Sequence, residues 1–414
     1  MKVVIEARFP HPEESGGVTQ AVISLATALS SLRDCRPDEE FIFITLASAG
    51  DWLDKHISGP CRLHKIPLTW KNRLARSPLG GPARMILRAI RKLRPPPPQG
   101  VATSDGLPDL LGADLVHFPA QQAYLTHLPN IYQPHDLQHL HLPQFFPAAD
   151  LAWRTIAYPL YCAKADIVLV ESSWTKDDVS QQYGIDRDKI AVCPFPPATT
   201  SYREPAAQEL AALKQKLGYS QFIFYPAHPW PHKNHLRLIE ALALLKEKTG
   251  LVVPLICTGR GKPLFSEIES TIQRLGLSDQ VRFLGYLSEA EMKAVYRLCT
   301  AVVIPTKFES VSFLIWEAFE AAKPVACSTV TSLPMQLGEA GLLFDPEDPN
   351  AIAEAIKALW ENAELREQLG QMGAARLRQF SLDRMAAHIL ALYRRLARTT
   401  NAQDRAILEA PPLI

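Results

Sequence analysis

The sequence lacks a regular cysteine framework, a long apolar run and a large net charge of either sign. Its seven cysteines are scattered, odd in number and never spaced as Cys-x-x-Cys, which argues against both a disulfide scaffold and a zinc site. No stretch approaches the roughly eighteen consecutive apolar residues that a membrane-spanning helix needs. The formal net charge of +1 provides no overall field for nucleic acid. We therefore expect a cytoplasmic protein with no nucleic-acid partner.

The amino terminus also lacks the pattern of a secretory signal, because Glu6 and Arg8 interrupt its first apolar run. What the chain does have is length. Its 414 residues suffice for two or three domains, each with a core of its own.

Short β-branched runs alternate with helical patterns in both halves of the sequence. In the first half the runs are residues 3–7, 41–47, 114–119, 130–135, 166–171 and 190–195. In the second half they are residues 222–227, 255–259, 281–286, 301–305, 325–328 and 341–344. Strands that alternate with helices predict doubly wound α/β domains, and this chain has two such series.

Closely spaced prolines at 194–197 disfavour both helix and strand, so we place the domain junction there. The prediction is an N-terminal Rossmann-like domain over 1–196 and a C-terminal one over 197–379. A final helix over 380–398 is expected to pack back on the first domain, and the aperiodic tail 399–414 to be loose. Ligands bind beyond the carboxyl ends of such strands, so we expect the two domains to face each other across a cleft.

Two acids, Glu309 and Glu317, stand eight residues apart where a buried run ends and a helical pattern begins. Two helical turns span about seven residues, so the second acid can lie on the helix while the first stays in the loop. Free N–H groups at the helix start suit a phosphate, and the flanking carboxylates would accept hydrogen bonds from sugar hydroxyls. The alternative is two solvated glutamates around a helix start.

A lysine, Lys233, lies just before the helical pattern 236–247. An ammonium is unfavourable at a helix N-terminus unless an anion lies between them, so Lys233 is a candidate phosphate ligand. The alternative is a surface lysine that keeps its charge in water. Arg260, between Gly259 and Gly261, would border a nucleotide or simply belong to a turn.

The first half offers a histidine and a glycine pair. His135 follows a predicted strand, where its imidazole could donate a hydrogen bond to a sugar. Metal binding is disfavoured there because His139 and His141 have neither cysteine nor a compact carboxylate set beside them. Gly16-Gly17, between a strand and a helix, would let a phosphate or sugar approach the backbone, or would form a tight turn.

Taken together, five motifs resemble the retaining glycosyltransferases of family 4, also called group 1 glycosyltransferases, which have the GT-B fold. They are Gly16-Gly17, His135-Asp136, His232-Lys233-Asn234, Gly285-Tyr286 and the Glu309/Glu317 pair. Their order and spacing agree with that family over most of the chain.

The resemblance implies a hexosyl transfer, mannosyl being one expectation, from a GDP- or UDP-linked sugar, with neither metal nor other cofactor. The residues expected to be catalytic are His135, Lys233 and Glu309. Lys233 would neutralise the diphosphate, Glu309 would hold the sugar hydroxyls and Glu317 the ribose. The donor-binding set is expected to comprise Gly16, Gly17, His228, Arg260, Tyr286, Ser310, Val311, Ser312, Phe313 and Glu317.

The chain departs from the family pattern at three positions. His228 stands where the family usually has an arginine, and Ser310 and Ser312 replace glycines. Two other hypotheses therefore remain: a nucleotide-sugar epimerase or phosphorylase of the same fold, and an inactive sugar-nucleotide-binding partner.

Residues 71–94 contain eight cations and no acid. Over 83–94 the apolar and basic residues form separate helical faces, a pattern typical of an interfacial helix on anionic lipid. This favours peripheral membrane contact and a sugar, lipid-linked or polysaccharide-precursor acceptor. A solvated basic face, or a patch for a phosphorylated soluble acceptor, is the alternative.

Overall fold

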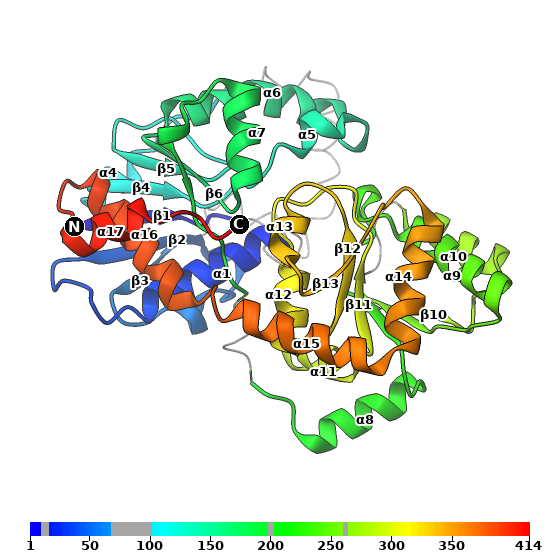
Figure 1. Cartoon of the computed structure of the whole chain (residues 1–414). Coiled ribbons are helices and arrows are strands. Elements are labelled where there is room, and N and C mark those ends of the chain that lie inside the picture. The colour runs from blue at the N-terminus through cyan, green and yellow to red at the C-terminus, as the bar shows by residue number, and fades with distance from the viewer. Residues whose placement is uncertain (10–15, 68–100, 198–202, 260–263) are drawn as a thin grey trace, which may run out of the picture. The chain divides into compact units, whose positions relative to one another are not determined.

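The computed structural model describes residues 1–9, 16–67, 101–197, 203–259 and 264–414. The chain forms two compact units. The first unit is Met1–Val170, Lys176–Cys193 and Leu382–Pro412, and the second is Glu171–Thr175, Pro194–Ser381 and Leu413–Ile414. Each unit is built on one parallel sheet with its helices (Figure 1).

The first unit has a seven-stranded parallel sheet in the order β3-β2-β1-β4-β5-β6-β7. The strands are β1 (Lys2–Glu6), β2 (Glu40–Leu46), β3 (Cys61–Ile66), β4 (Leu115–Phe118), β5 (Asn130–Tyr132), β6 (Ile167–Val170) and β7 (Ile190–Val192). Val4 of β1 lies opposite Ile42 on one side and Val116 on the other. These central residues are buried because helices cover both faces of a doubly wound sheet.

The edge strand β3 was not predicted. Cys61 is buried, but the next five residues are partly or fully exposed, so the strand has no continuous apolar run. The helices of this unit are α1 (Gly17–Ser30), α4 (Leu107–Leu110), α5 (Gln138–His141), α6 (Ala148–Lys164), α7 (Ser173–Tyr183, whose first residues belong to the second unit), α16 (Leu382–Leu396) and α17 (Ala402–Glu409).

The second unit has a six-stranded parallel sheet in the order β10-β9-β8-β11-β12-β13. The strands are β8 (Ile223–Tyr225), β9 (Leu255–Cys257), β10 (Val281–Phe283), β11 (Ala301–Ile304), β12 (Val325–Ser328) and β13 (Gly341–Phe344). The helices are α8 (Ala207–Leu217), α9 (His235–Thr249), α10 (Phe265–Arg274), α11 (Glu289–Leu298), α12 (Phe313–Glu320), α13 (Leu333–Leu337), α14 (Pro349–Glu361) and α15 (Ala363–Leu377).

In both sheets the strand order reverses beside the first strand, between β1 and β4 and between β8 and β11. Open α/β sheets bind ligands beyond the carboxyl ends of the strands at such a reversal. In the second unit the segments that follow β8 and β11 carry Lys233 and Glu309. The fold thus brings these two candidate residues to one end of one sheet.

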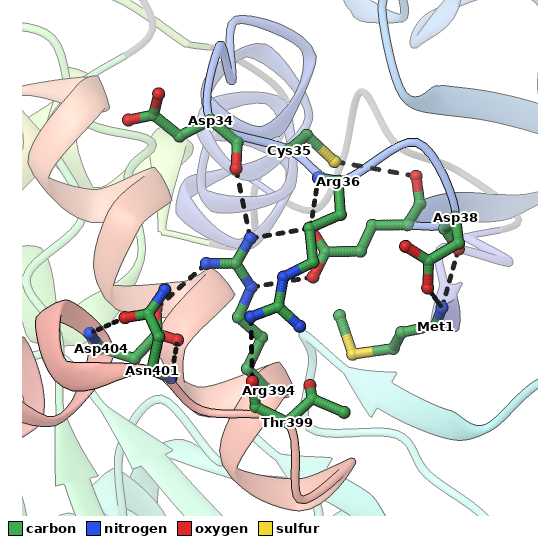
Figure 2. A network of polar contacts seen from close by, with 10 residues as sticks. Met1, Asp34, Cys35, Arg36, Asp38, Arg394, Thr399, Asn401 and Asp404 are labelled. Atoms are coloured by element: carbon green, nitrogen blue, oxygen red, sulfur yellow. Dashed lines mark hydrogen bonds and ion pairs between the residues drawn. The ribbon is translucent and has the colours of Figure 1, made fainter.

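The expectation of a loose tail after residue 399 is wrong. Helix α17 follows α16 against the first unit (Figure 1), and Asn401 and Asp404 cap its start with two 2.8 Å hydrogen bonds. Arg394 of α16 binds Asp404 at 3.1 Å (Figure 2) and Glu39 at 2.8 Å. A capping box and a buried ion pair order this segment, and neither produces hydrophobic periodicity. The last residue, Ile414, is 1% exposed in the core of the second unit.

Among the helices that the structure describes, none is both long and apolar enough to cross a bilayer. The predicted basic helix within 71–94 lies outside the described residues.

Candidate functional site

Lys233 and Glu309 form an ion pair at the carboxyl end of the second sheet. After β8 the chain makes a short 3-10 turn that ends at Lys233, and α9 begins two residues later. The Tyr225 hydroxyl, at the end of β8, donates to the Lys233 carbonyl at 2.8 Å. The Lys233 ammonium donates to Oε1 of Glu309, and the two side chains are 19% and 14% exposed. The cation and the acid predicted separately from the sequence therefore meet.

Asn234 fixes the turn that carries Lys233. Its φ of 60° is left-handed, a conformation that asparagine tolerates better than most residues. Its side-chain amide donates to the carbonyl oxygens of Pro305 and Pro346, both at 2.9 Å. The lysine backbone is thus tied to the loops that follow β11 and β13.

Three polar residues hold the loop from Glu309 to Ser312. Thr331 donates its hydroxyl to the Glu309 carbonyl, and Ser332 donates to the Ser310 carbonyl. The Gln336 amide receives a hydrogen bond from Ser312 N and donates one to Ser312 O, both at 2.8 Å. Sequence reasoning missed these three residues, which lie in the segment between the buried run 325–328 and the next one at 341–344.

Helix α12 begins at Phe313, immediately after this loop. Ser312 is its N-cap residue, yet its side chain makes no capping hydrogen bond. The Ser312 hydroxyl is buried, and within the described chain it has no hydrogen-bond partner. The first N–H groups of a helix lack intrahelical acceptors, so this start offers donors to an anion only a few residues along the chain from Glu309. Val311 and Phe313 are partly buried beside it.

Glu317, one turn into α12, has a different partner from Glu309. The buried Tyr296 of α11 donates its hydroxyl to Oε2 of Glu317 at 2.6 Å. Burial raises the pKa of Glu317 to about 7; the Tyr296 hydrogen bond opposes this rise and the charge of Glu320 adds to it. The two predicted acids are therefore held separately, one by a cation and the other by a phenol.

His228 lies beside the turn between β9 and α10. Gly259 has a φ of +80° and donates its N–H to the Gly285 carbonyl at 3.0 Å. A Cβ at Gly259 would lie 2.9 Å from Nδ1 of His228, so the histidine packs against this glycine. Tyr286, next to Gly285, is 87% exposed. Arg260 lies outside the described residues.

Burial decides which residue near the turn carries charge. It lowers the pKa of His232 to about 2 and that of His235 to about 3. Both imidazoles are neutral at physiological pH, so Lys233 supplies the positive charge of the His232-Lys233-Asn234 motif.

In the first unit, His135 has a φ of 63° and is buried beyond the end of β5. Its Nε2 lies 3.0 Å from the Pro119 carbonyl oxygen. A carbonyl can only accept, so Nε2 carries the proton of this contact. Nε2 is therefore engaged within the protein, and the predicted hydrogen bond from His135 to a sugar stays a prediction that concerns Nδ1.

Glu6 and Arg8, at the carboxyl end of β1, form a polar group that sequence reasoning missed. Arg8 donates to both carboxylate oxygens of Glu6 at 2.6 and 2.7 Å, and to Asp105 at 2.6 Å. Its guanidinium lies 5.6 Å from the ring centre of Tyr124. The available signal was the Glu-x-Arg sequence that begins at the last residue of the first buried strand. Gly16, with a φ of 50°, precedes the start of α1 at Gly17.

No group of three or more His, Cys, Asp or Glu residues in the described ranges has the arrangement of a metal site. The histidines that follow His135 have other partners. His141 contacts the Asp178 carboxylate at 2.9 Å, and burial lowers the pKa of His139 to about 4.

Two Rossmann-like parallel sheets define an α/β protein of the GT-B fold, and comparison with known proteins agrees. The family model described as "Glycosyl transferases group 1" matches residues 211–376, and the family model described as "Glycosyltransferase Family 4" matches residues 15–196. The chain belongs to this family of glycosyltransferases.

Individual relatives are distant. O-antigen chain mannosyltransferase B of Escherichia coli is 26% identical over 284 residues, which span 66% of this chain and 74% of that enzyme. D-inositol 3-phosphate glycosyltransferase of Corynebacterium glutamicum is 28% identical over 239 residues, which span 55% of this chain and only 57% of that enzyme. The structure of Anabaena HepE in complex with UDP and glucose has a TM-score of 0.69 at 19% identity, covering 95% of this chain and 99% of HepE. At this identity the likeness concerns the fold.

Proposed function

We propose that the protein is a retaining, metal-independent hexosyltransferase that uses a nucleotide-sugar donor. The observation that carries the proposal is the Lys233–Glu309 ion pair at the strand-order reversal of the second sheet, directly before the N-terminus of α12. A phosphate-binding cation, a hydroxyl-binding acid and unpaired helix N–H groups are the chemistry that a sugar diphosphate requires.

The donor would bind with its diphosphate between Lys233 and the start of α12. This placement separates Lys233 from Glu309 and frees the carboxylate to accept hydrogen bonds from sugar hydroxyls. Glu317 would accept the ribose hydroxyls, and the exposed Tyr286 is available to the base. The mannosyltransferase relative favours a mannosyl donor, and HepE, solved with UDP and glucose, favours a UDP-sugar, so GDP and UDP are both donor candidates.

In the reaction, the acceptor hydroxyl oxygen forms a bond to the anomeric carbon on the face that the diphosphate leaves. The bond from that carbon to the phosphate oxygen breaks, and the acceptor proton passes to the departing oxygen. Negative charge grows on the diphosphate, and a fixed ammonium with helix N–H groups stabilises it without a metal ion.

For the acceptor we propose a sugar or lipid-linked precursor of a polysaccharide, built at the cytoplasmic face of a membrane. The support is the relationship to an O-antigen chain mannosyltransferase and the basic pattern of residues 71–94. The Glu6–Arg8–Asp105 group suits acceptor hydroxyls better than a phosphate, because three guanidinium nitrogens are already bound to carboxylates.

The test is product analysis with UDP-, GDP- and ADP-sugars, an oligosaccharide acceptor and excess chelator. The proposal expects release of one nucleoside diphosphate, coupled to a glycoside with the anomeric configuration of the donor. Inversion would contradict the retaining assignment, and loss of turnover in chelator would contradict metal independence. An epimerase or phosphorylase would instead alter the donor without glycosylating the acceptor, and an inactive partner would bind without turnover.

A further inference from the structure

Tyr296 is buried in the second unit with its hydroxyl directed at Glu317. The residue is 3% exposed, on the third turn of α11. Its ring packs edge-on against Phe224 of β8, with centroids 5.0 Å apart and planes at 81°. The contact with Phe224 restricts the orientation of the Tyr296 ring. It thereby also restricts the position of the hydroxyl, which donates to Oε2 of Glu317 at 2.6 Å.

The other charged groups around Glu317 are engaged with one another. Lys293 of α11 lies 3.3 Å from Glu320 of α12 and 2.8 Å from Glu204, before α8. Arg297 also pairs with Glu204, at 3.1 Å. With Glu289, Met292 and Ala321, the residues Lys293, Tyr296, Arg297, Glu317 and Glu320 line one small cavity. Of the described residues that line this cavity, Lys293 and Arg297 are paired with other acids, and Glu317 accepts from the phenol of Tyr296.

A phenol constrains a carboxylate in two ways. It occupies one oxygen, so the orientation of the other is set, and it favours the ionised acid because the hydrogen bond is stronger to a charged acceptor. Burial acts in the opposite direction and raises the pKa of Glu317 to about 7. The carboxylate consequently titrates near neutral pH, where a change in the Tyr296 contact has a measurable effect.

We infer that Tyr296 is a positioning residue for the donor: it holds Oε2 of Glu317 so that Oε1 is presented to the vicinal hydroxyls of a ribose. This inference rests on the proposed function, in which Glu317 binds the nucleotide part of the donor. Ribose hydroxyls donate best to an ionised carboxylate, so binding is tightest when Glu317 has lost its proton. Tyr296 thereby controls both the orientation of Glu317 and the pH at which the donor is bound.

The experiment is isothermal titration calorimetry of UDP-, GDP- and ADP-sugars with the full chain between about pH 5.5 and pH 8.5, comparing parent, Tyr296→Phe and Glu317→Gln. Nucleotide-sugars are used because their diphosphate lacks the terminal phosphate proton, whose pKa is about 6 in a free nucleotide. Tyr219→Phe is the matched control, since that hydroxyl donates to the Asp279 carbonyl at 2.6 Å elsewhere in the same unit. For the parent, affinity for one nucleotide-sugar rises as pH increases through the titration of Glu317. Tyr296→Phe lowers that affinity at pH 7 by roughly tenfold or more and moves the midpoint to higher pH. Tyr219→Phe changes neither.

A double variant separates positioning from a general packing defect. In the Glu317→Gln background the pH dependence is absent, and Tyr296→Phe then adds little. An equal affinity loss in both backgrounds, or an unchanged midpoint in Tyr296→Phe, would overturn the inference. If Tyr296→Phe does not fold, Glu317→Asp takes its place, because the shorter side chain withdraws the carboxylate from the Tyr296 hydroxyl by one methylene. The pH midpoint of nucleotide-sugar binding must rise in this variant as well. An unchanged midpoint overturns the inference. A parent that binds none of the nucleotide-sugars would contradict the proposed function and this inference together, whereas normal binding by Tyr296→Phe contradicts the inference alone.

Discussion

The Lys233 ammonium and the Glu309 carboxylate, 76 residues apart in the chain, pair with each other at the carboxyl end of the second sheet. The pair links the segment after β8 to the segment after β11, the two strands at which the order reverses. A diphosphate that enters this position must replace the carboxylate at the ammonium. The pair keeps both charges satisfied in the free protein, and under the proposed function it would supply both groups to the donor.

The first prediction concerns the coupling within this pair. Lys233→Met and Glu309→Gln each leave a partly buried group without its partner, so each lowers the free energy of unfolding. A double-mutant cycle should give a coupling of roughly 1–2 kcal/mol, between the values for exposed and buried pairs. The exposed Arg203–Glu209 pair in the same unit is the control and should show weaker coupling. Chemical denaturation measures both cycles. Equal coupling energies for the two pairs would contradict the claim that the Lys233–Glu309 pair is partly shielded from solvent.

The second prediction concerns pH and Glu317. Its pKa in the folded protein is about 7 against an ordinary value of 4.5, so between these values the folded state binds more protons than the unfolded state. The stability contributed by this group therefore falls as pH rises through that window. Glu317→Gln keeps an acceptor for Tyr296 and removes the charge, so it should stabilise the free protein more at pH 8 than at pH 4.5, as measured by melting temperature. The exposed Glu269→Gln is the control; a pH-independent difference for Glu317→Gln would refute the buried-acid interpretation.

The third prediction concerns Arg394, which joins α16 to Glu39 and to Asp404 of α17. All three side chains are at most 6% exposed, so removal of the cation leaves two buried carboxylates unpaired. Arg394→Met should cost about 3–5 kcal/mol in the free energy of unfolding. Arg395→Met, at an exposed neighbouring position, should change it by less than about 0.5 kcal/mol. A similar small effect for both variants would show that the tail is as loose as the sequence suggests.

The fourth prediction contrasts Ser312 with Gln336. The Ser312 hydroxyl is buried without a partner in the described chain, so Ser312→Ala should leave stability unchanged or raise it slightly. Gln336 is fully buried and bonds both backbone groups of Ser312. Gln336→Leu leaves the Ser312 N–H unsatisfied, whereas the Ser312 carbonyl keeps the N–H of Ile315 at 3.2 Å, so the variant should cost about 1–3 kcal/mol. Thermal unfolding distinguishes them. A destabilised Ser312→Ala would mean that the hydroxyl supports the loop.

The sequence was sufficient for the parallel sheets because buried central strands such as β1 and β11 are continuous apolar runs. It was insufficient for β3, an edge strand whose residues after Cys61 are partly or fully exposed, and for α17, a short helix fixed by capping and Arg394. Neither feature leaves a hydrophobic period that can be recognised locally.

For the candidate site, the sequence identified the residue types and the structure identified their partners. Lys233 and Glu309 were recognisable because each lies beside a predicted helix start. Thr331, Ser332 and Gln336 were not, because polar residues that bond only backbone carry no pattern until the fold places them. Tyr296 was hidden for a similar reason: its apolar ring belongs to the core period of α11, and only its hydroxyl reaches Glu317.

The most direct test of the central claim is donor affinity in chelator, measured by calorimetry for parent and Lys233→Ala with UDP-, GDP- and ADP-sugars. Lys248→Ala is the control. This exposed lysine lies near the C-terminal end of α9, opposite the end that follows Lys233, and it contacts Asn350 of α14. The account predicts that the parent binds one nucleotide-sugar, that Lys233→Ala weakens it by about tenfold or more, and that Lys248→Ala binds normally. Equal binding by parent and Lys233→Ala would contradict the account, because the diphosphate would then lie elsewhere.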